Sequence, residues 1–231
     1  MRICIISDLH ANLEALAALP SDYDELWVLG DLVDYGPDPA ETIEFVRSHA
    51  STVIRGNHDN AVGFGTDCGC SPRFTAMAEA TRKYTTSVLS ASDKQFLRDL
   101  PTCACRQLDG RVFFLCHATP SDLLYEYRPP DSPLWARDEE SSSGADVLLA
   151  GHTHLPFVRV FGERVVANPG SLGQSKVGGA RARYAVWQDD HIELKDYEYP
   201  VNKTIHKILT LPLPEEVKHD LVCVLRTGTA P

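Results

Sequence analysis

The first sixty residues alternate short apolar runs with amphipathic segments, and this alternation restricts the folds open to the chain. Runs of strand length are separated by segments with helical spacing, at 2–7, 12–19, 25–29, 39–49 and 52–54. Strands that alternate with helices form parallel sheets, because each helix provides a crossover connection. Asp38, Pro39 and Glu41 specify one helix start, as an N-cap residue, a proline at the first helical position and an acidic residue three positions after the cap. We therefore expect parallel strands at the start of the chain.

The later part of the chain changes to pairs of strands. A helical stretch at 72–100 comes first, with a second helix start predicted at Ser92 and Gln95 as a capping pair. Three hairpins are then predicted, at 103–108 with 111–116, 157–161 with 164–167, and 184–187 with 192–199. We expect these strands to form a second sheet that faces the first.

Two segments lie outside this pattern. Residues 120–144 contain four prolines, three consecutive serines and three aromatic residues, which is typical of a long surface loop or lid, with an ordinary variable loop as the alternative. The tail predicts a helix that docks on the body, from apolar residues at helical spacing: Leu213, Val217, Leu221 and Val224. We expect one domain over 1–231, with 200–231 as a C-terminal extension.

The composition restricts partners and compartment. The chain has 231 residues, of which 43% are hydrophobic, enough for one substantial core, and its formal net charge is -10. An acidic surface repels the nucleic-acid backbone, so we expect no stable nucleic-acid binding. The first apolar run reaches a carboxylate at residue 8, too soon for a signal peptide or membrane span, and the seven cysteines lack framework spacing. These features favour a cytoplasmic protein with reduced thiols and no membrane association.

Polar side chains follow each of the three predicted parallel strands. Asp8 and His10 follow the first strand, Asp31 follows the second, and Asn57 with His58 follows the third. The carboxyl ends of parallel strands meet at one edge of a sheet, where ligand crevices form. Carboxylate, amide and imidazole groups are ligands for divalent metal ions. Each motif alone is weak evidence, and polar loops with capping roles are the alternative for the set.

Three more histidines end apolar runs in the second half of the chain. His117 follows 112–116, and His152 with His154 follows 147–150. Residues at positions i and i+2 of an extended segment share one side, so the last two can serve one metal ion or two neighbouring ions. A lone histidine is usually a hydrogen-bonded core residue, but three at strand ends favour metal binding.

The order of these motifs resembles the calcineurin-like metallophosphoesterase family. The matching motifs are Asp8-x-His10, Gly30-Asp31-x-x-Asp34, Gly56-Asn57-His58-Asp59, His117 and Gly151-His152-x-His154. Five motifs in this order are far more specific than any one of them, and the short spacings look like the small bacterial and archaeal single-domain branch. The resemblance implies an α/β (α+β) fold, a four-layer αββα sandwich of two mixed β-sheets flanked by helices.

The resemblance also implies two divalent metal ions. One ion would be bound by Asp8, His10, Asp31 and His154, and the other by Asp31, Asn57, His117 and His152, so that Asp31 bridges them. The mixed oxygen and nitrogen ligands suit manganese, iron, zinc, nickel or cobalt, which the sequence does not distinguish. Two cations about 3.5–4 Å apart can clamp a phosphoryl group and lower the pKa of a shared water, which then supplies a hydroxide nucleophile.

Three further residues are candidates for catalysis. His58 is suited to protonate the leaving oxygen, because the pKa of histidine lies near neutrality. By resemblance Asp34 would orient the imidazole of His58, although a role in capping the following turn is equally open. Arg55 can bind phosphate oxygens, with a salt bridge to a surface carboxylate as the alternative. The turn 168–171 is expected to shape the pocket wall.

Tyr35 distinguishes this chain from the phosphoprotein phosphatases of the superfamily, which carry arginine at the corresponding position. Without that phosphate-binding group, small phosphodiesters or phosphomonoesters such as nucleotides are favoured over phosphoproteins. We therefore expect a dinuclear metal-dependent hydrolase of phosphoester bonds that acts on a small phosphorylated substrate. The alternatives are a phosphoprotein phosphatase and a non-catalytic metal-binding scaffold of the same fold. The sequence does not specify the oligomeric state.

Overall fold

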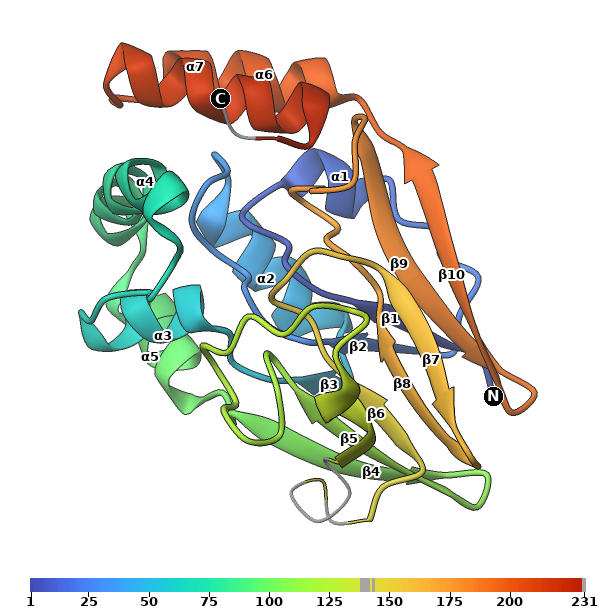
Figure 1. The fold of residues 1–231 in the computed structure, drawn as a ribbon. Coiled ribbons are helices and arrows are strands. Elements are labelled where there is room, and N and C mark those ends of the chain that lie inside the picture. The colour runs from blue at the N-terminus through green and yellow to red at the C-terminus, as the bar shows by residue number, and fades with distance from the viewer. Residues whose placement is uncertain (138–141, 143, 230–231) are drawn as a thin grey trace.

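Two five-stranded sheets pack face to face, with helices on their outer sides (Figure 1). The computed structural model describes residues 1–137, 142 and 144–229. Each sheet contains both parallel and antiparallel pairs of strands. The predicted fold class, two mixed sheets flanked by helices, is confirmed.

The first sheet contains the parallel strands predicted at the start of the chain. Its strands, in spatial order, are β10 (His191–Glu198), β9 (Arg181–Gln188), β1 (Ile3–Ile6), β2 (Glu25–Val28) and β3 (Thr52–Val53). Strands β1, β2 and β3 run parallel, whereas β9 is antiparallel to β1 and β10 is antiparallel to β9. The carboxyl ends of β1, β2 and β3 therefore lie at one edge.

The second sheet contains the other two hairpins. Its strands, in spatial order, are β4 (Cys103–Leu108), β5 (Arg111–Cys116), β6 (Val147–Leu149), β8 (Arg164–Asn168) and β7 (Phe157–Phe161). Asp109 (φ 50°) and Gly110 (φ 81°) both have positive φ between β4 and β5, as a tight hairpin turn requires. All three predicted hairpins are confirmed, but the prediction that they all form the second sheet was wrong: the third, β9 with β10, extends the first sheet because β9 pairs with β1.

The described residues also contain seven α-helices and two 3-10 helices. They are α1 (Leu13–Ala17), α2 (Pro39–His49), α3 (Asn57–Phe64), η1 (Pro72–Phe74), α4 (Thr75–Val88), α5 (Ala91–Asp99), η2 (Pro133–Arg137), α6 (Val201–Thr210) and α7 (Glu215–Thr227). The tail forms two helices, α6 and α7, after the last strand, where the sequence predicted one. Figure 1 shows α6 and α7 across one end of the molecule. Helix α6 contacts α7 and α1, and helix α7 contacts α4.

Two predicted helix starts differ from the structure in detail. Helix α5 is capped by Ser90 and Asp93, each side chain bonding the other's backbone N–H, so the predicted pair at Ser92 and Gln95 was wrong by two residues. Asp38 is at the N-cap position of α2 as predicted, but its side chain makes no capping bond. Its carboxylate instead accepts from Lys207 Nζ at 2.9 and 3.0 Å, because α6 brings this cation close.

The core between the sheets is aromatic and aliphatic. Trp27 and Trp187 from the first sheet pack edge-to-face on Phe113 from the second, with ring centroids 5.2 and 5.0 Å apart. All three are at most 2% exposed. Burying side chains of this size stabilises the fold by roughly 1.5–3 kcal/mol each. This packing holds the two sheets, and hence the strand ends of both, in a fixed relation.

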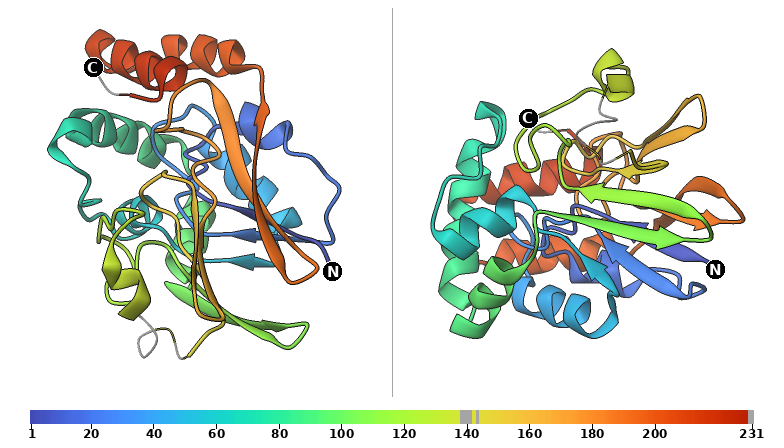
Figure 2. Two further views of the ribbon diagram at one scale, coloured as in Figure 1. Left: turned by 45° about the vertical axis from the view of Figure 1, so that its right-hand side comes forward. Right: turned by 90° about the horizontal axis from the view of Figure 1, so that it is seen from below.

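Residues 120–137 lie over part of the outer face of the second sheet. Trp135, in η2, is 2% exposed and packs against Phe157 at a ring distance of 5.5 Å. Figure 2 shows η2 outside this sheet. Residues 138–141 and 143 of the predicted loop lie outside the described residues.

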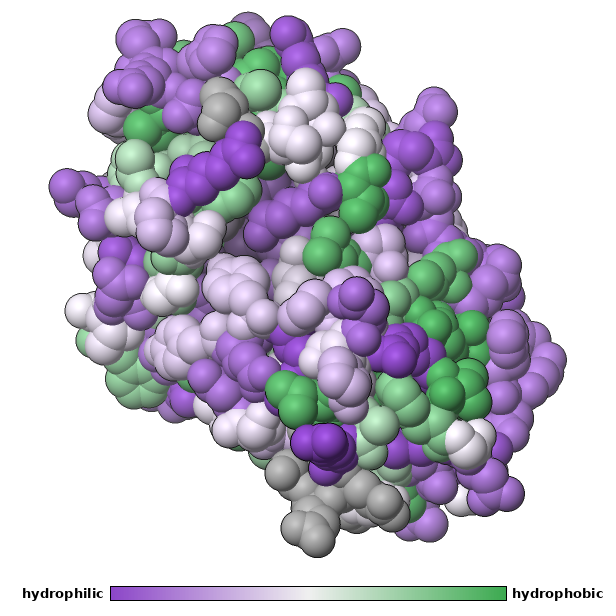
Figure 3. Space-filling model, in the orientation of Figure 1, coloured by the Kyte–Doolittle hydropathy of each residue, from purple (hydrophilic) through white to green (hydrophobic). Residues whose placement is uncertain are grey.

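The surface shown in Figure 3 is mostly hydrophilic, with apolar side chains gathered over β7, where Val158 and Val160 are exposed. All seven cysteines are free thiols. No helix among the described residues has both the length and the apolar character that crossing a bilayer requires.

Candidate metal centre and active site

The seven predicted metal ligands converge at the strand ends of the two sheets. They follow β1 (Asp8, His10), β2 (Asp31), β3 (Asn57), β5 (His117) and β6 (His152, His154), and each is at most 3% exposed. Asn57 is the first residue of α3, so it extends from the helix start that follows β3. Two sets of candidate ligands have atoms within 4.8 Å of one another: Asp8, His10 and His154, and Asp31, His117 and His152.

The first set is centred on two facing imidazoles. His10 Nε2 and His154 Nε2 are 3.1 Å apart, and His154 Nε2 is 3.3 Å from Asp8 Oδ1. The other oxygen of Asp8 accepts the backbone N–H of His152 at 3.1 Å. One oxygen of Asp8 is thus fixed by the backbone, and the other is directed at the imidazoles.

Asp31 lies between the two sets. Its Oδ2 is 3.2 Å from His117 Nε2 and 3.8 Å from His10 Nε2, whereas its Oδ1 accepts the backbone N–H of His58 at 2.9 Å. Asn57 joins the second set, since its Oδ1 is 3.0 Å from a ring nitrogen of both His117 and His152.

Backbone carbonyls fix the orientation of the imidazoles. Nδ1 of three histidines lies 2.6–3.1 Å from a carbonyl oxygen, in the pairs His10 with Val33, His117 with Leu29, and His154 with Gln174. A carbonyl only accepts, so Nδ1 donates and Nε2 is left to bind a metal. His152 is reversed: its Nε2 lies 3.3 Å from the carbonyl of Tyr125, and its Nδ1 is turned to Asn57.

This donor set fits metal ions. If the neutral rings of His10 and His154 each carry their proton on Nδ1, two lone pairs face each other at 3.1 Å, which is repulsive unless a cation lies between them. Burial lowers the pKa of both rings and, with the charge of His117, lowers the pKa of His152 to about 3. Neutral imidazoles are the form that binds metal.

His117 differs from the other rings because of its carboxylate neighbour. Burial lowers its pKa, but the adjacent Asp31 outweighs burial and raises the pKa to about 9. Burial likewise opposes ionisation of Asp31, whereas His117 and His58 hold its pKa well below the usual value. A metal ion would replace the proton that His117 otherwise holds against Asp31.

Five of the candidate ligands adopt an uncommon backbone conformation. Their φ angles are positive: Asp8 (54°), His10 (46°), Asp31 (55°), His152 (64°) and His154 (60°). Such a conformation costs on the order of 1–3 kcal/mol per residue and persists where surrounding contacts impose it. For Asp31 the contact is Asp59, whose carboxylate accepts the N–H groups of Asp31, Leu32 and Gly56 at 2.8, 2.8 and 2.9 Å.

His58 and Asp34 form a buried pair beside the ligands. His58 Nδ1 is 2.9 Å from Asp34 Oδ2, and the His58 ring packs edge-on against His10 at 5.1 Å. Burial lowers the pKa of His58, but Asp31 and Asp34 outweigh it, so the net pKa is raised. The imidazole therefore favours its protonated form, with Nε2 not engaged by Asp34.

Comparison with known proteins assigns the chain to a family. Residues 1–190 match the family model of the calcineurin-like phosphoesterase superfamily domain. The chain belongs to this superfamily. The predicted resemblance is confirmed, and the protein is placed among the metallophosphoesterases, enzymes that hydrolyse phosphoester bonds.

Three relatives show the extent of the similarity. The crystal structure of a metallophosphoesterase from Sphaerobacter thermophilus has a TM-score of 0.82 and 31% identity, with 99% of both chains covered. Phosphodiesterase YfcE of Escherichia coli is 26% identical over 82% of this chain and 89% of its own length. The symmetrical bis(5'-nucleosyl)-tetraphosphatase of Vibrio campbellii is 26% identical over 80% of this chain and 65% of its own length.

Arg55 of this phosphoesterase is not brought together with the other predicted site residues. Its Nη1 donates to the carbonyl of Arg98 at 2.8 Å, and its guanidinium lies over the ring of Phe64 at 4.9 Å. These contacts hold the Arg55 guanidinium against α5 and α3. We therefore leave Arg55 out of the proposed machinery.

The turn 168–171 braces the ligand-bearing loops of the phosphoesterase. Asn168 Nδ2 donates to the carbonyl of Gly151 at 2.6 Å, and Ser171 Oγ donates to the carbonyl of Asp8 at 2.8 Å. The turn thus supports Asp8 and the loop of His152 and His154 from behind.

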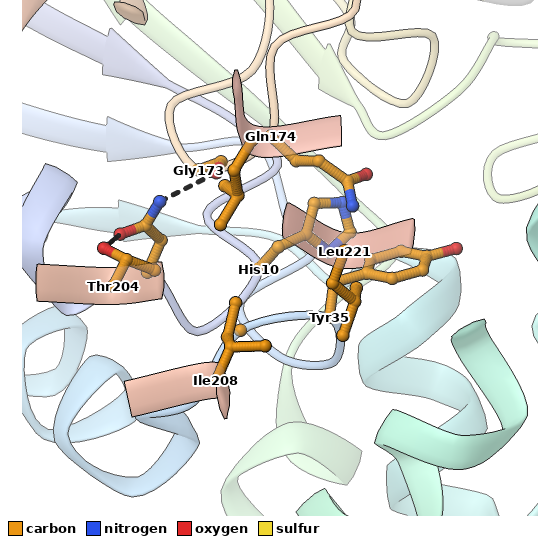
Figure 4. Close-up of a pocket in the computed structure, with 10 residues that line it drawn as sticks. His10, Tyr35, Gly173, Gln174, Thr204, Ile208 and Leu221 are labelled. Carbon is orange, nitrogen blue, oxygen red and sulfur yellow. Dashed lines mark hydrogen bonds between the residues drawn. The ribbon is translucent and has the colours of Figure 1, made fainter. Parts of the chain in front are cut away.

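Helix α6 is linked to the loop after β1 through Asn12. Thr204 Oγ1 donates to Asn12 Oδ1 at 2.9 Å, and Asn12 Nδ2 donates to the carbonyl of Gly173 at 2.8 Å (Figure 4). The cavity between His10 and the C-terminal helices measures about 10 Å³, room for about one water molecule. It is therefore too small for a substrate.

Several residues of the site were missed in the sequence. Asp59 stands in the quoted motif, and its position three residues after an N-cap glycine was a usable signal. The carbonyls of Tyr125 and Gln174 have no local signal, because their places depend on how distant segments pack.

Proposed function

We propose that the protein is a two-metal phosphodiesterase of small substrates. One ion would be held by Asp8, His10, Asp31 and His154, and the other by Asp31, Asn57, His117 and His152. The observation that carries this proposal is the position of Asp31 Oδ2, 3.2 Å from a ligand atom of one set and 3.8 Å from a ligand atom of the other. A carboxylate so placed suits a bridge between two ions.

The protein's own groups would orient the reaction. When bound, the ions would supply positive charge to the phosphoryl oxygens and lower the pKa of a water molecule. Asp34 holds Nδ1 of His58, so the proton on Nε2 of His58 is available to the leaving oxygen. The raised pKa of His58 favours the acid form that this role needs. Asp34 acts through His58 as a positioning residue.

Tyr35 supports a preference for diesters. Its ring is 5% exposed and lies 4.8 Å from the rings of both His10 and His58. This aromatic side chain brings no positive charge to the edge of the site. A phosphodiester carries one negative charge fewer than a monoester, so it requires less cationic compensation. The relative named as a phosphodiesterase supports the same class.

Hydrolysis of bis(p-nitrophenyl) phosphate in Mn²⁺ tests the proposal. We expect metal-dependent turnover that falls about 10²–10³-fold in His58→Ala, with metal content retained, because a general acid contributes 10²–10⁴-fold. Asp31→Asn should lose both activity and metal. His206→Ala, at an exposed position on α6, is the matched control. Unchanged rates in both site variants would defeat the proposal and favour the scaffold alternative, while faster hydrolysis of a phosphopeptide would favour a phosphoprotein phosphatase.

A further inference from the structure

Lys176 is held at the edge of the metal centre between two aromatic rings. Its Nζ lies 4.8 Å from the ring centroid of Phe74, at the end of η1, and 6.0 Å from that of Tyr127, in the segment over the second sheet. The ring of Tyr127 is in turn 4.0 Å from the ring of His152. Three segments distant in the sequence thus place the Lys176 ammonium near Tyr127, whose ring packs against the candidate metal ligand His152.

Among the described residues, Lys176 forms no salt bridge that would neutralise its charge. No carboxylate in the part of the chain that the structure describes lies within 4 Å of its ammonium. Burial lowers the pKa of Lys176, and the charges of Asp8 and Asp31 oppose that lowering. The side chain is only half-buried. Arg55 points to α5 and position 35 is a tyrosine, whereas Lys176 lies beside the centre. Arg128, also near this side, pairs with Glu126 at 2.9 Å.

A cleft adjoins this cation. It has a volume of about 460 Å³, within the range of roughly 300–1,000 Å³ typical of small-molecule sites. It is lined by Ser71, Tyr127, Arg128, Pro129, Thr153, Leu155 and Lys176. Thr153 is the neighbour of His152, so the cleft opens beside the metal ligands. Tyr127 is 44% exposed, which leaves ring surface open to a ligand.

The chemistry of this cleft matches one class of phosphoester. A lysine ammonium binds a phosphate oxygen, and an exposed aromatic face stacks on a flat ring, as aromatic side chains do with bases. Apolar walls of proline and leucine complete a surface that favours a base over a small alkyl group. A sugar phosphate or a simple alkyl diester would leave the ring of Tyr127 unused.

We propose that this cleft binds the nucleoside part of the substrate, with Tyr127 stacked on the base, Lys176 on a non-bridging phosphate oxygen and Phe74 positioning Lys176. The substrates would then be nucleotide phosphodiesters. This inference rests on the proposed function, because the phosphorus must lie at the metal centre for the base to reach the cleft.

Two chromogenic diesters isolate the nucleoside contribution. Thymidine 5'-(4-nitrophenyl phosphate) and methyl 4-nitrophenyl phosphate have the same charge and release the same 4-nitrophenolate. We expect kcat/KM in Mn²⁺ to be at least tenfold higher for the thymidine ester, because base stacking adds to binding only there. Tyr127→Leu should bring the ratio of the two values close to one, whereas Tyr127→Phe, which keeps the ring, should preserve it.

Substitution of Lys176 gives a different pattern. Lys176→Met keeps the aliphatic stem but removes the charge, so KM should rise about tenfold for both esters, and Lys176→Arg should recover part of the loss. Phe161→Leu serves as the control for Tyr127→Leu, because it also removes an aromatic ring near a cation, Arg159 at 4.7 Å, and Phe161 does not line the cleft. Thermal unfolding of each variant checks that it is folded.

The outcomes separate the two proposals. The nucleoside site would be overturned if kcat/KM of the wild type were about equal for the thymidine and methyl esters, or if Tyr127→Leu kept the wild-type ratio of the two values. Unchanged KM values in Lys176→Met would also overturn it. Hydrolysis of neither ester by the wild-type protein in any of the five candidate metals would overturn the proposed function, and this inference with it.

Discussion

Close contact between two glycines brings two candidate ligands together. A Cβ atom on Gly30 (φ +93°) would lie 2.5 Å from the backbone nitrogen of Gly56, and a Cβ atom on Gly56 would lie 2.1 Å from Asp31 Oδ1. Real Cβ contacts are never so short, so only glycine permits this approach. The ends of β2 and β3 can therefore place Asp31 and Asn57 at one centre.

Substitution of Gly56 should disturb the metal centre before it disturbs the rest of the fold. We expect Gly56→Ala to weaken Mn²⁺ binding at least tenfold and to lower the free energy of unfolding by about 1–3 kcal/mol, because the added methyl group must displace Asp31. Titration calorimetry and thermal unfolding measure the two effects. Gly63→Ala in α3 is the control, since its Cβ would come no closer than 3.2 Å to another atom, and that nearest atom is Cγ of the flexible Arg98 side chain. Equal Mn²⁺ affinity in the Gly56 variant and the wild type would contradict this account.

Helix α6 is joined by polar contacts to the segments around the ligand-bearing loop after β1. Lys207 bonds Glu14 of α1 and Asp38 at the start of α2, both at 2.9 Å. Thr204, fully buried, bonds Asn12, which is also the N-cap of α1. Helix α6 therefore positions the start of α1, two residues after His10.

The Thr204 hydroxyl can be removed with little change of shape. We expect Thr204→Val to lower the free energy of unfolding by about 1–2 kcal/mol, because the buried Oδ1 of Asn12 loses its best donor and keeps only the N–H of Ala15 at 3.3 Å. Urea unfolding measures the change. Thr210→Val, exposed on the same helix, should have a smaller effect. Equal losses in the two variants would show that the Asn12 contact contributes nothing of its own.

For the whole molecule, the buried ligand cluster couples metal binding to stability. Two carboxylates and four imidazoles lie at most 3% exposed in one place, and folding has already provided the strained backbone that holds them. An ion that binds only the folded state stabilises it by about 2.7 kcal/mol at one hundred times its Kd.

Addition of metal should therefore raise the Tm. We expect a rise of roughly 5–10 °C in Mn²⁺ at one hundred times its Kd, reversed by a chelator, because about 1 kcal/mol shifts the Tm of a chain of this size by about 2–4 °C. Differential scanning calorimetry measures it. Asp31→Asn should show a much smaller rise. A Tm that none of the five candidate metals alters would argue against resident ions. That residues 1–231 fold as one domain stays a prediction.

Local patterns in the sequence were enough for the strands, the hairpins and the grouping of the candidate ligands. Strand periodicity and turn residues such as Asp109-Gly110 depend on neighbours in the chain, and parallel strands bring their carboxyl ends together by geometry alone. Asp8, Asp31 and Asn57 could thus be predicted to meet without any knowledge of packing. The family motif supplied the expected partners among the histidines.

Tertiary structure alone decided where side chains point and which backbone groups support them. Arg55 turns to the carbonyl of Arg98, 43 positions away, and the Asp38 carboxylate binds Lys207 rather than its own helix start. Lys176 meets Phe74 and Tyr127 only because three distant segments pack at one edge. A side chain has several rotamers of similar energy, and contacts from distant parts of the chain select among them, so no local pattern encodes that choice.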